Sequence, residues 1–248
     1  MKISVITVCY NSEATIRETV ESVLTQTHRD VEYIVVDGGS KDGTLEILSR
    51  YVERIQHLTS EPDSGVYDAM NKGLALATGD VVGFLNSDDV YVHSGILSRV
   101  AAVMMNPAID GCYADLIYVK KNDEGRVVRH WVSRPYAPGL FRRGWMPPHP
   151  TFFVRRACYD AFGGFDPQLL ISADFELAMR FLHVHGIRTR YVPEDWVRMR
   201  TGGLSSSWRR VLRTNIETYR VCRRHGLSVI PWFVVAKISS RIPQFFVR

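Results

Sequence analysis

Residues 33–44 read Tyr-Ile-Val-Val-Asp-Gly-Gly-Ser-Lys-Asp-Gly-Thr, an apolar run that ends in an acid and a glycine-rich turn. The apolar run predicts a buried strand, and the apolar residues that recur over 45–55 predict a helix after the turn. The same alternation is found on both sides, with strands at 3–8 and 81–85 and helices at 16–24 and 66–77. Nearly continuous apolar strands that alternate with helices indicate an α/β fold, a mostly parallel sheet with helices on both faces.

The rest of the chain gives a less regular pattern. Asn11-Ser12 offers an N-cap for the helix at 16–24. Residues 112–120 and 126–132 predict a hairpin, and a helix is expected from Ser172 to His185. We expect one α/β domain over residues 1–205 and a separate basic tail over 206–248.

Composition limits the class of protein. The chain has 248 residues, of which 46% are hydrophobic and 23% charged, which excludes a disordered or fibrous protein. It contains no run of 18 apolar residues, so no conventional membrane-spanning helix is expected. The N-terminus is expected to be a buried strand and not a signal peptide. The four cysteines are far apart, which favours reduced thiols in a cytosolic protein.

Charge is unevenly distributed along the chain. Residues 198–248 contain eleven Lys or Arg and one acid, a net charge of +10. The whole chain carries +5, so residues 1–197 carry −5. The sequence thus joins a mildly acidic body to a strongly basic tail.

Polar residues follow the predicted strands. Tyr10-Asn11 follows the first strand, Asp37 the second, and residues 86–89 (Asn-Ser-Asp-Asp) the strand at 81–85. Because parallel strands present their carboxyl ends at one edge, these side chains are expected to converge there. The chain has neither GxGxxG after its first strand nor GxxxxGK[ST]. Acids at this edge instead suit a divalent cation that accompanies a diphosphate ligand.

Four segments occur together in an order and spacing found in one enzyme family. They are residues 6–11 (ITVCYN), 35–44 (VVDGGSKDGT), 63–73 (DSGVYDAMNKG) and 84–89 (FLNSDD). With them the chain resembles family 2 glycosyltransferases of the GT-A fold, the group that builds bacterial O-antigens and exopolysaccharides. The resemblance covers about residues 3–205. It implies a nucleotide-binding half over 1–92 and an acceptor half over 93–205.

The resemblance implies a metal and a nucleotide site. Asp88 and Asp89 match the family's metal-binding acids, which hold Mg²⁺ or Mn²⁺, although Asn86 replaces the first acid of that motif. The residues matched to nucleotide-sugar binding are Val8, Tyr10, Asn11, Asp37, Asp63, Asn71, Lys72 and Asn86. Many members carry a second Asp where this chain has Gly38. The alternatives are that Asp37 is a turn residue, Tyr10 a core aromatic, Lys72 an exposed helix residue and 86–89 an ordinary turn.

The resemblance places the catalytic base at Asp174, in a segment that opens a helix. Residues i and i+2 of a helix point about 200° apart, so Glu176 is expected to face away from the substrate that Asp174 meets. Among acceptor or loop residues we also count Glu176, together with His149 and Gly203. Gly203 lies in a glycine pair that resembles a loop closing over the donor.

These assignments predict an inverting transfer of one sugar, from a UDP-linked donor, to an acceptor hydroxyl. The processive Gln-x-x-Arg-Trp segment is absent, so single additions are expected. A lipid-linked glycan is the expected acceptor. The alternatives are a nucleotidyltransferase, which would need a basic loop after its first strand, and a non-catalytic sugar- or nucleotide-binding module. Nucleic acid is not an expected partner, because the acids at the sheet edge would repel it.

The basic tail suggests a membrane partner. Over 208–224 an apolar face with Trp208 and Cys222 is set against arginines, and 227–247 is apolar and aromatic but interrupted by prolines and charges. Such a segment suits the interface of an anionic membrane, on the inner face of the cell membrane. The alternatives are that it packs on the catalytic domain or on a second copy of the chain, in a homodimer.

Overall fold

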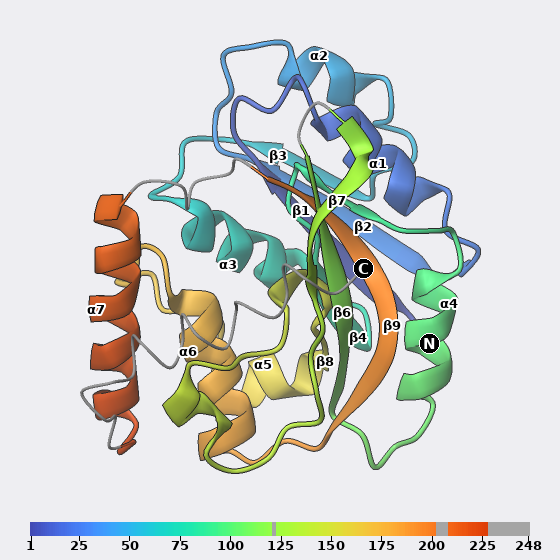
Figure 1. The fold of residues 1–248 in the computed structure, drawn as a ribbon. Coiled ribbons are helices and arrows are strands. Elements are labelled where there is room, and N and C mark those ends of the chain that lie inside the picture. The colour runs from blue at the N-terminus through green and yellow to red at the C-terminus, as the bar shows by residue number, and fades with distance from the viewer. Residues whose placement is uncertain (121–122, 202–207, 228–248) are drawn as a thin grey trace.

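One mixed sheet forms the centre of the molecule, with helices on both faces (Figure 1). The computed structural model describes residues 1–120, 123–201 and 208–227. The strands are β1 (Ile3–Cys9), β2 (Val31–Asp37), β3 (His57–Ser60), β4 (Val81–Phe84), β5 (Asp89–Tyr91), β6 (Gly111–Lys120), β7 (Asp123–Trp131), β8 (Phe153–Arg155) and β9 (Thr189–Arg200). The helices are α1 (Ile16–Leu24), α2 (Thr44–Ser49), α3 (Val66–Leu76), α4 (Ile96–Met104), α5 (Arg156–Phe162), α6 (Ala173–Met179) and α7 (Trp208–Arg224). Short helical turns are η1 (Leu140–Arg143), η2 (His149–Thr151) and η3 (Arg180–Val184).

The first half of the chain has the expected parallel arrangement. β1 lies between β2 and β4, and all three run parallel, with β3 added beyond β2. The strands are buried along almost their whole length because helices cover both faces. The α/β fold class is therefore confirmed, and the carboxyl ends of these strands share one edge.

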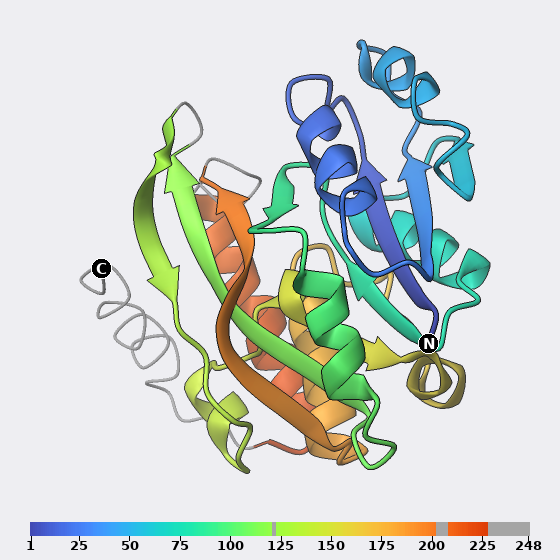
Figure 2. The same ribbon diagram turned by 90° about the vertical axis from the view of Figure 1, so that its right-hand side faces the viewer.

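The second half of the sheet is mixed. β8 runs antiparallel to β4 and β6, β7 runs antiparallel to β6, and β5 runs antiparallel to β9. Figure 2 shows the β6–β7 hairpin beside β9, which is parallel to β6. β8 can approach β4 closely because Gly83 has no side chain: a Cβ there would overlap the ring of Phe153.

Two hydrophobic clusters pack on opposite faces of the sheet. One contains residues of α1, α2 and α4, and the other contains residues of α3, α5, α6 and α7. β1 contributes to both, since Val5 and Cys9 face the first and Ile6 and Val8 face the second. The four cysteines are buried, and they form no disulfide in the described part of the chain.

Several elements differ from the sequence-based expectation. The N-cap of α1 is Thr15 and not Asn11-Ser12, because the loop at 11–12 is bonded to residues 40–44 instead. α2 ends at Ser49, and the residues up to Arg54 form turns. The helix expected to His185 changes to π-helical geometry at η3. The strands β3, β5, β8 and β9 were not expected.

The helix α7 packs on the body of the protein. Val221, Cys222 and Leu227 are buried in the same cluster as α6. Two residues of the expected apolar face thus point in different directions: Cys222 is buried against the body of the protein, whereas Tyr219 is exposed. The other residues of that face and the segment 228–248 lie outside the described side chains. None of the helices in the described part of the chain is long and apolar enough to cross a bilayer.

Glu32, near the start of β2, connects residues at the start of β1 with Thr78, which precedes β4. Its buried carboxylate accepts hydrogen bonds from Lys2 Nζ (2.6 Å), Ser4 Oγ (2.6 Å), Thr78 N (2.7 Å) and Thr78 Oγ1 (2.6 Å). Burial by itself would raise the pKa of Glu32, but these hydrogen bonds outweigh it and lower the pKa from 4.5 to about 2.

Glu32→Gln should lower the free energy of unfolding by roughly 2–3 kcal/mol at pH 7, because a lowered folded-state pKa stabilises the fold above the unfolded-state pKa. The difference from wild type should shrink as the pH falls from 4.5 towards about 2. Urea titrations over this pH range measure it, with the exposed Glu53→Gln as control. A difference that does not depend on pH would contradict the assignment.

Candidate active site

The loops that follow β1 and β2 are bonded to each other. Asn11 N donates to Ser40 Oγ (2.8 Å), and Lys41 N donates to Asn11 Oδ1 (2.9 Å). Asn11 has a φ of 48°, a left-handed conformation that asparagine tolerates better than most residues. Ser12 Oγ lies 2.9 Å from Ser87 Oγ, which connects the turn after β4. The strand ends expected to converge thus form one rim.

Asp37 is buried at the centre of this rim. Its carboxylate accepts hydrogen bonds from Gly39 N (3.0 Å), Ser40 N (2.9 Å), Ser40 Oγ and Ser60 Oγ (2.7 Å). Burial raises the pKa of Asp37, but the bonds from Ser40 and Ser60 outweigh this effect and keep the pKa below its usual value. The carboxylate is therefore ionised, and it holds the loop between β2 and α2 in place.

Gly38 leaves a space that the carboxylate of Asp63 fills. A Cβ at position 38 would overlap Asp63 Oδ2 and would lie 3.5 Å from Tyr10 Cδ2. Asp63 Oδ1 accepts the N–H of Gly65 (2.8 Å), just before α3. Tyr10 is 59% exposed, so it is not a core aromatic. The carboxylate of Asp63 and the exposed ring of Tyr10 therefore lie together beside Asp37. The side chain of Val8, in contrast, is buried in the core.

Asn71 and Lys72 are both engaged within the protein. Asn71 Nδ2 donates to Phe165 O (2.9 Å), and Phe165 N donates to Asn71 Oδ1 (2.9 Å). Lys72 pairs with Glu61 (2.8 Å) and also donates to Pro62 O (3.1 Å). These contacts favour structural roles, with Asn71 joining α3 to the second half of the chain.

Residues 86–89 cross the rim between β4 and β5. Asp88 is half-buried in the turn, whereas Asp89 is fully buried at the start of β5. Asn86 Nδ2 donates to Asp89 Oδ2 (3.3 Å), and Asp89 Oδ1 has no hydrogen-bond partner among the described residues. Burial, and then the charge of Asp88, raise the pKa of Asp89 well above its usual value. A buried carboxylate oxygen without a partner, next to a second acid, fits a divalent cation.

Arg200 also reaches this turn, although no sequence motif pointed to it. Its Nη1 donates to Asp88 O (3.1 Å), and its guanidinium pairs with Glu18 of α1. Arg200 is buried at the end of β9, and the glycine pair at 202–203 begins two residues later in the sequence. Gly203 itself lies outside the described residues.

Asp174 stands in the first turn of α6, half-buried. Tyr67 of α3 donates its hydroxyl to Ile171 O (2.6 Å) and lies 3.4 Å from Asp174 Oδ1. Burial and the charge of Asp174 raise the pKa of Tyr67 well above its usual value, so its hydroxyl remains a donor. Tyr67 was not among the expected site residues, although it lies inside the motif 63–73.

Glu176 faces the opposite way from Asp174, as the helical spacing predicts. It is buried and binds Arg180 Nε (2.9 Å) and His225 Nε2 (2.9 Å). These two cationic partners favour a structural role for Glu176, and its place among the acceptor or loop residues stays a prediction.

His149 is buried between the two halves of the site. Its ring stacks on Phe84 at the end of β4 and meets Phe165 edge-on, with both ring centroids 5.6 Å away. Burial lowers the pKa of His149, against the opposing charge of Asp174, so the ring is neutral near pH 7. His149 Nε2 has no hydrogen-bond partner in the described part of the chain.

A second group of metal-ligating side chains lies on β6, β7 and β9. Ligand atoms of Asp115, His130 and Asp195 lie within 4.8 Å of one another. His130 Nε2 is already 2.6 Å from Asp195 Oδ1, and Asp115 accepts Tyr191 Oη (2.8 Å) and Ser133 N (2.6 Å). Internal hydrogen bonds therefore satisfy this cluster, in contrast to Asp89.

Comparisons with known proteins identify the family of the chain. Residues 4–160 match the family model described as glycosyl transferase family 2. A PGL/p-HBAD biosynthesis glycosyltransferase of Mycobacterium tuberculosis is 31% identical over 193 residues, which are 76% of this chain and 73% of that protein.

Solved structures share the fold at low sequence identity. Crystal structures of S. aureus TarS are 20% identical to this chain. The structure of TarS residues 1–349 in complex with UDP has a TM-score of 0.69, and the match covers 99% of this chain and 72% of that chain. In a longer TarS chain the match covers 44% of its length. Mannosyltransferase PcManGT from Pyrobaculum calidifontis, in complex with GDP-Man and Mn²⁺, is 20% identical with a TM-score of 0.68, with 95% and 68% covered. By its family model, its relatives and its GT-A fold, the chain belongs to glycosyl transferase family 2 and is a glycosyltransferase.

Proposed function

We propose that this glycosyltransferase moves one sugar from a UDP-linked donor to an acceptor hydroxyl, with inversion at the anomeric carbon. The observation that carries the proposal is the convergence of Tyr10, Asp63 and the 86–89 turn at one rim, with a buried Asp89 oxygen that has no hydrogen-bond partner. UDP or UDP-GlcNAc in TarS structures, and GDP-Man in PcManGT, support a nucleotide-sugar donor.

In this proposal the nucleotide lies along the edge formed by Tyr10, Gly38 and Asp63. The exposed ring of Tyr10 offers a surface for the base, and Asp63 offers an acceptor for base or ribose donors. Asp37 acts mainly by fixing the loop that begins at Gly38, because its own oxygens are occupied.

Asp88 and Asp89, with the amide of Asn86, would hold Mg²⁺ or Mn²⁺, and the Mn²⁺ in PcManGT supports this choice. When bound, the cation would neutralise charge that develops on the departing diphosphate. Arg200 supports the same turn by donating to the carbonyl of Asp88.

Asp174 is the proposed base. It would take the proton from the acceptor hydroxyl as the oxygen attacks the anomeric carbon, on the side opposite the diphosphate. One displacement with one base gives inversion without a covalent intermediate. Tyr67 holds the segment before α6 by donating its hydroxyl to Ile171 O, its oxygen lies 3.4 Å from Asp174 Oδ1, and the neutral His149 lies in the wall beside it.

We propose a lipid-linked glycan as the acceptor, in the synthesis of a surface polysaccharide of the O-antigen or exopolysaccharide type. The M. tuberculosis relative is named as a glycosyltransferase of PGL/p-HBAD biosynthesis, which supports a role for this chain in a biosynthetic pathway. Such an acceptor would place the protein on the cytoplasmic face of the membrane.

Gly38→Ala should weaken UDP binding by at least about tenfold, because its Cβ would displace the carboxylate of Asp63. Gly38→Asp should weaken UDP binding further, because it also places another carboxylate beside that of Asp63. Calorimetric titration with UDP measures the effect, and Gly95→Ala in the loop before α4 is the control. Wild-type affinity in both Gly38 variants would contradict this position of the nucleotide.

Asp88→Asn should reduce Mn²⁺-dependent UDP binding by at least about tenfold while leaving the melting temperature close to that of wild type. The exposed Asp160→Asn on α5 serves as the control with the same loss of charge. If Asp88→Asn binds UDP and Mn²⁺ like wild type, the metal site lies elsewhere.

Asp174→Asn should bind UDP normally but turn over the donor about a hundredfold more slowly, the usual scale for a positioned base. Glu176→Gln should instead lower stability by roughly 1–3 kcal/mol, because it weakens a buried ion pair. UDP release and urea titrations separate the two effects. Equal losses of turnover at both positions, in folded protein, would contradict the assignment of Asp174.

A further inference from the structure

The helix α7 is bonded directly to the segment that carries Asp174. Glu217 accepts the backbone N–H groups of Ile171 (3.0 Å) and Ser172 (3.1 Å), immediately before α6. At the other end of α7, Arg224 pairs with Asp166 (2.6 Å), next to the His225–Glu176 pair. The inner face of α7 therefore fixes the first turn of α6 in place.

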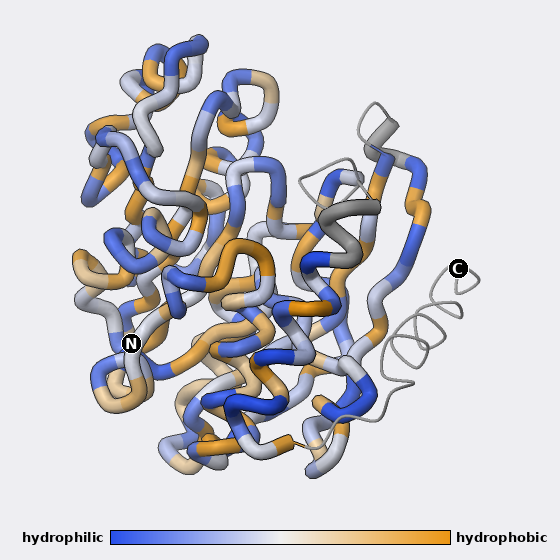
Figure 3. The backbone as a smooth tube through the Cα atoms, turned by 90° about the vertical axis from the view of Figure 1, so that its left-hand side faces the viewer, coloured by the Kyte–Doolittle hydropathy of each residue, from blue (hydrophilic) through white to orange (hydrophobic). Residues whose placement is uncertain are grey.

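The outer face of α7 has a different composition. It carries four exposed arginines, Arg213, Arg220, Arg223 and Arg224. Ile216 (50% exposed) and Tyr219 (43% exposed) lie among them. Figure 3 turns this side of the molecule towards the viewer and shows hydrophilic and hydrophobic residues in alternation along α7. Arg213 pairs with Glu217 and Arg224 with Asp166, whereas no ion pair is recorded for Arg220 or Arg223 within the described residues.

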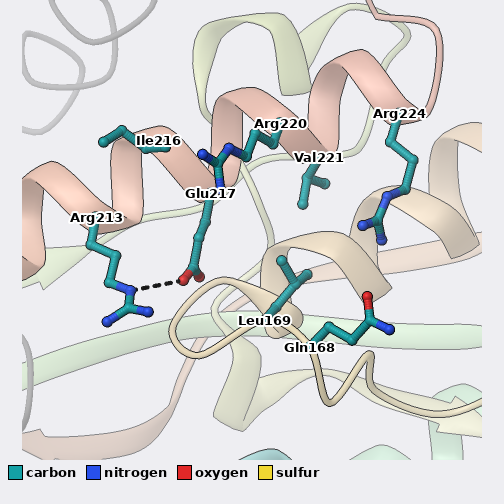
Figure 4. Close-up of a pocket in the computed structure, with 8 residues that line it drawn as sticks. All are labelled: Gln168, Leu169, Arg213, Ile216, Glu217, Arg220, Val221 and Arg224. Atoms are coloured by element: carbon teal, nitrogen blue, oxygen red, sulfur yellow. Dashed lines mark ion pairs between the residues drawn. The ribbon is translucent and has the colours of Figure 1, made fainter.

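A groove of about 280 Å³ runs between α7 and the loop before α6 (Figure 4). Leu169 and Val221 contribute apolar surface, and Arg213, Arg220 and Arg224 extend towards it from α7. Glu217 is the only acid among the residues that line it, and its carboxylate is engaged by Arg213 and by two backbone N–H groups. The groove is thus a cationic surface with an apolar floor.

We propose that the outer face of α7 docks on an anionic lipid bilayer, with headgroup phosphates at its exposed arginines, above all Arg220 and Arg223, and with Ile216 and Tyr219 inserted between headgroups. Arginines match phosphate geometry, and exposed apolar residues between them are typical of interfacial helices. The chain after Leu227 continues with three basic residues and no acid. Nucleic acid fits less well, because a duplex offers no apolar layer for the exposed side chains of Ile216 and Tyr219.

The docking has a consequence for the proposed function, on which this part of the inference rests. Glu217 lies on the same helix as the docking face and holds Ser172, two residues before Asp174. A bilayer bound to α7 would therefore bring a lipid-linked acceptor to the side of the protein that carries the base.

Flotation of the full-length protein with vesicles tests the docking. Wild type should float with vesicles that contain phosphatidylglycerol, and much less with pure phosphatidylcholine or at high salt. The double variant Arg220→Gln/Arg223→Gln should reduce partitioning by about tenfold or more. Arg142→Gln/Arg143→Gln, two exposed arginines of η1, removes the same charge and should float like wild type.

Three results would overturn the proposal: no binding of wild type to anionic vesicles, an equal loss in both double variants, or no loss in Arg220→Gln/Arg223→Gln. Equally tight binding to a DNA duplex at physiological salt would overturn the choice of lipid as partner. UDP binding by the same preparations keeps the two hypotheses separate. Normal UDP binding without flotation removes only the docking, whereas flotation without UDP binding or donor turnover removes only the proposed function.

Discussion

The buried carboxylate of Asp37 is the contact on which the rim of the sheet depends. It accepts hydrogen bonds from the loop that follows its own strand and from Ser60 at the end of β3, while Cys9 at the end of β1 lies 3.6 Å away. These bonds keep an ionised group stable inside the protein, which would otherwise be unfavourable. They also bring Tyr10, Gly38 and Asp63 side by side. The nucleotide site that we propose at this edge would therefore depend on a residue whose main contacts are with the protein itself.

The first half of the fold was predictable because each buried strand is a continuous apolar run followed by a turn signal. β9 was missed because Pro193 and Glu194 interrupt its pattern, and its pairing with β6 shifts register beside Asp115. In the site, helical spacing predicted the opposite directions of Asp174 and Glu176. The sequence could not reveal that Asn71 bonds to the backbone of Phe165, since that contact joins residues 94 positions apart.

The first half of the chain and α7 contribute different contacts to the candidate site. The acidic first half supplies the rim, and α7 supplies contacts that fix the start of α6. The sequence showed α7 as a basic amphipathic segment but did not show which face would be buried. Cys222 and Val221 decide this by packing with α6, which leaves the arginines outside. Amphipathic pattern alone cannot distinguish a helix that packs on its own protein from one that lies on a lipid surface.

The hydrogen bonds of Tyr67 set a length scale for the substrates. Asp63 lies in the loop before α3 and Tyr67 in the first turn of that helix, and Tyr67 bonds directly to the segment of Asp174. The proposed nucleotide edge and the proposed base are therefore joined through the start of α3. A site with a fixed span selects donors by their length from base to anomeric carbon. Sugars that differ only in the orientation of a hydroxyl have the same length, so they must be distinguished by other contacts.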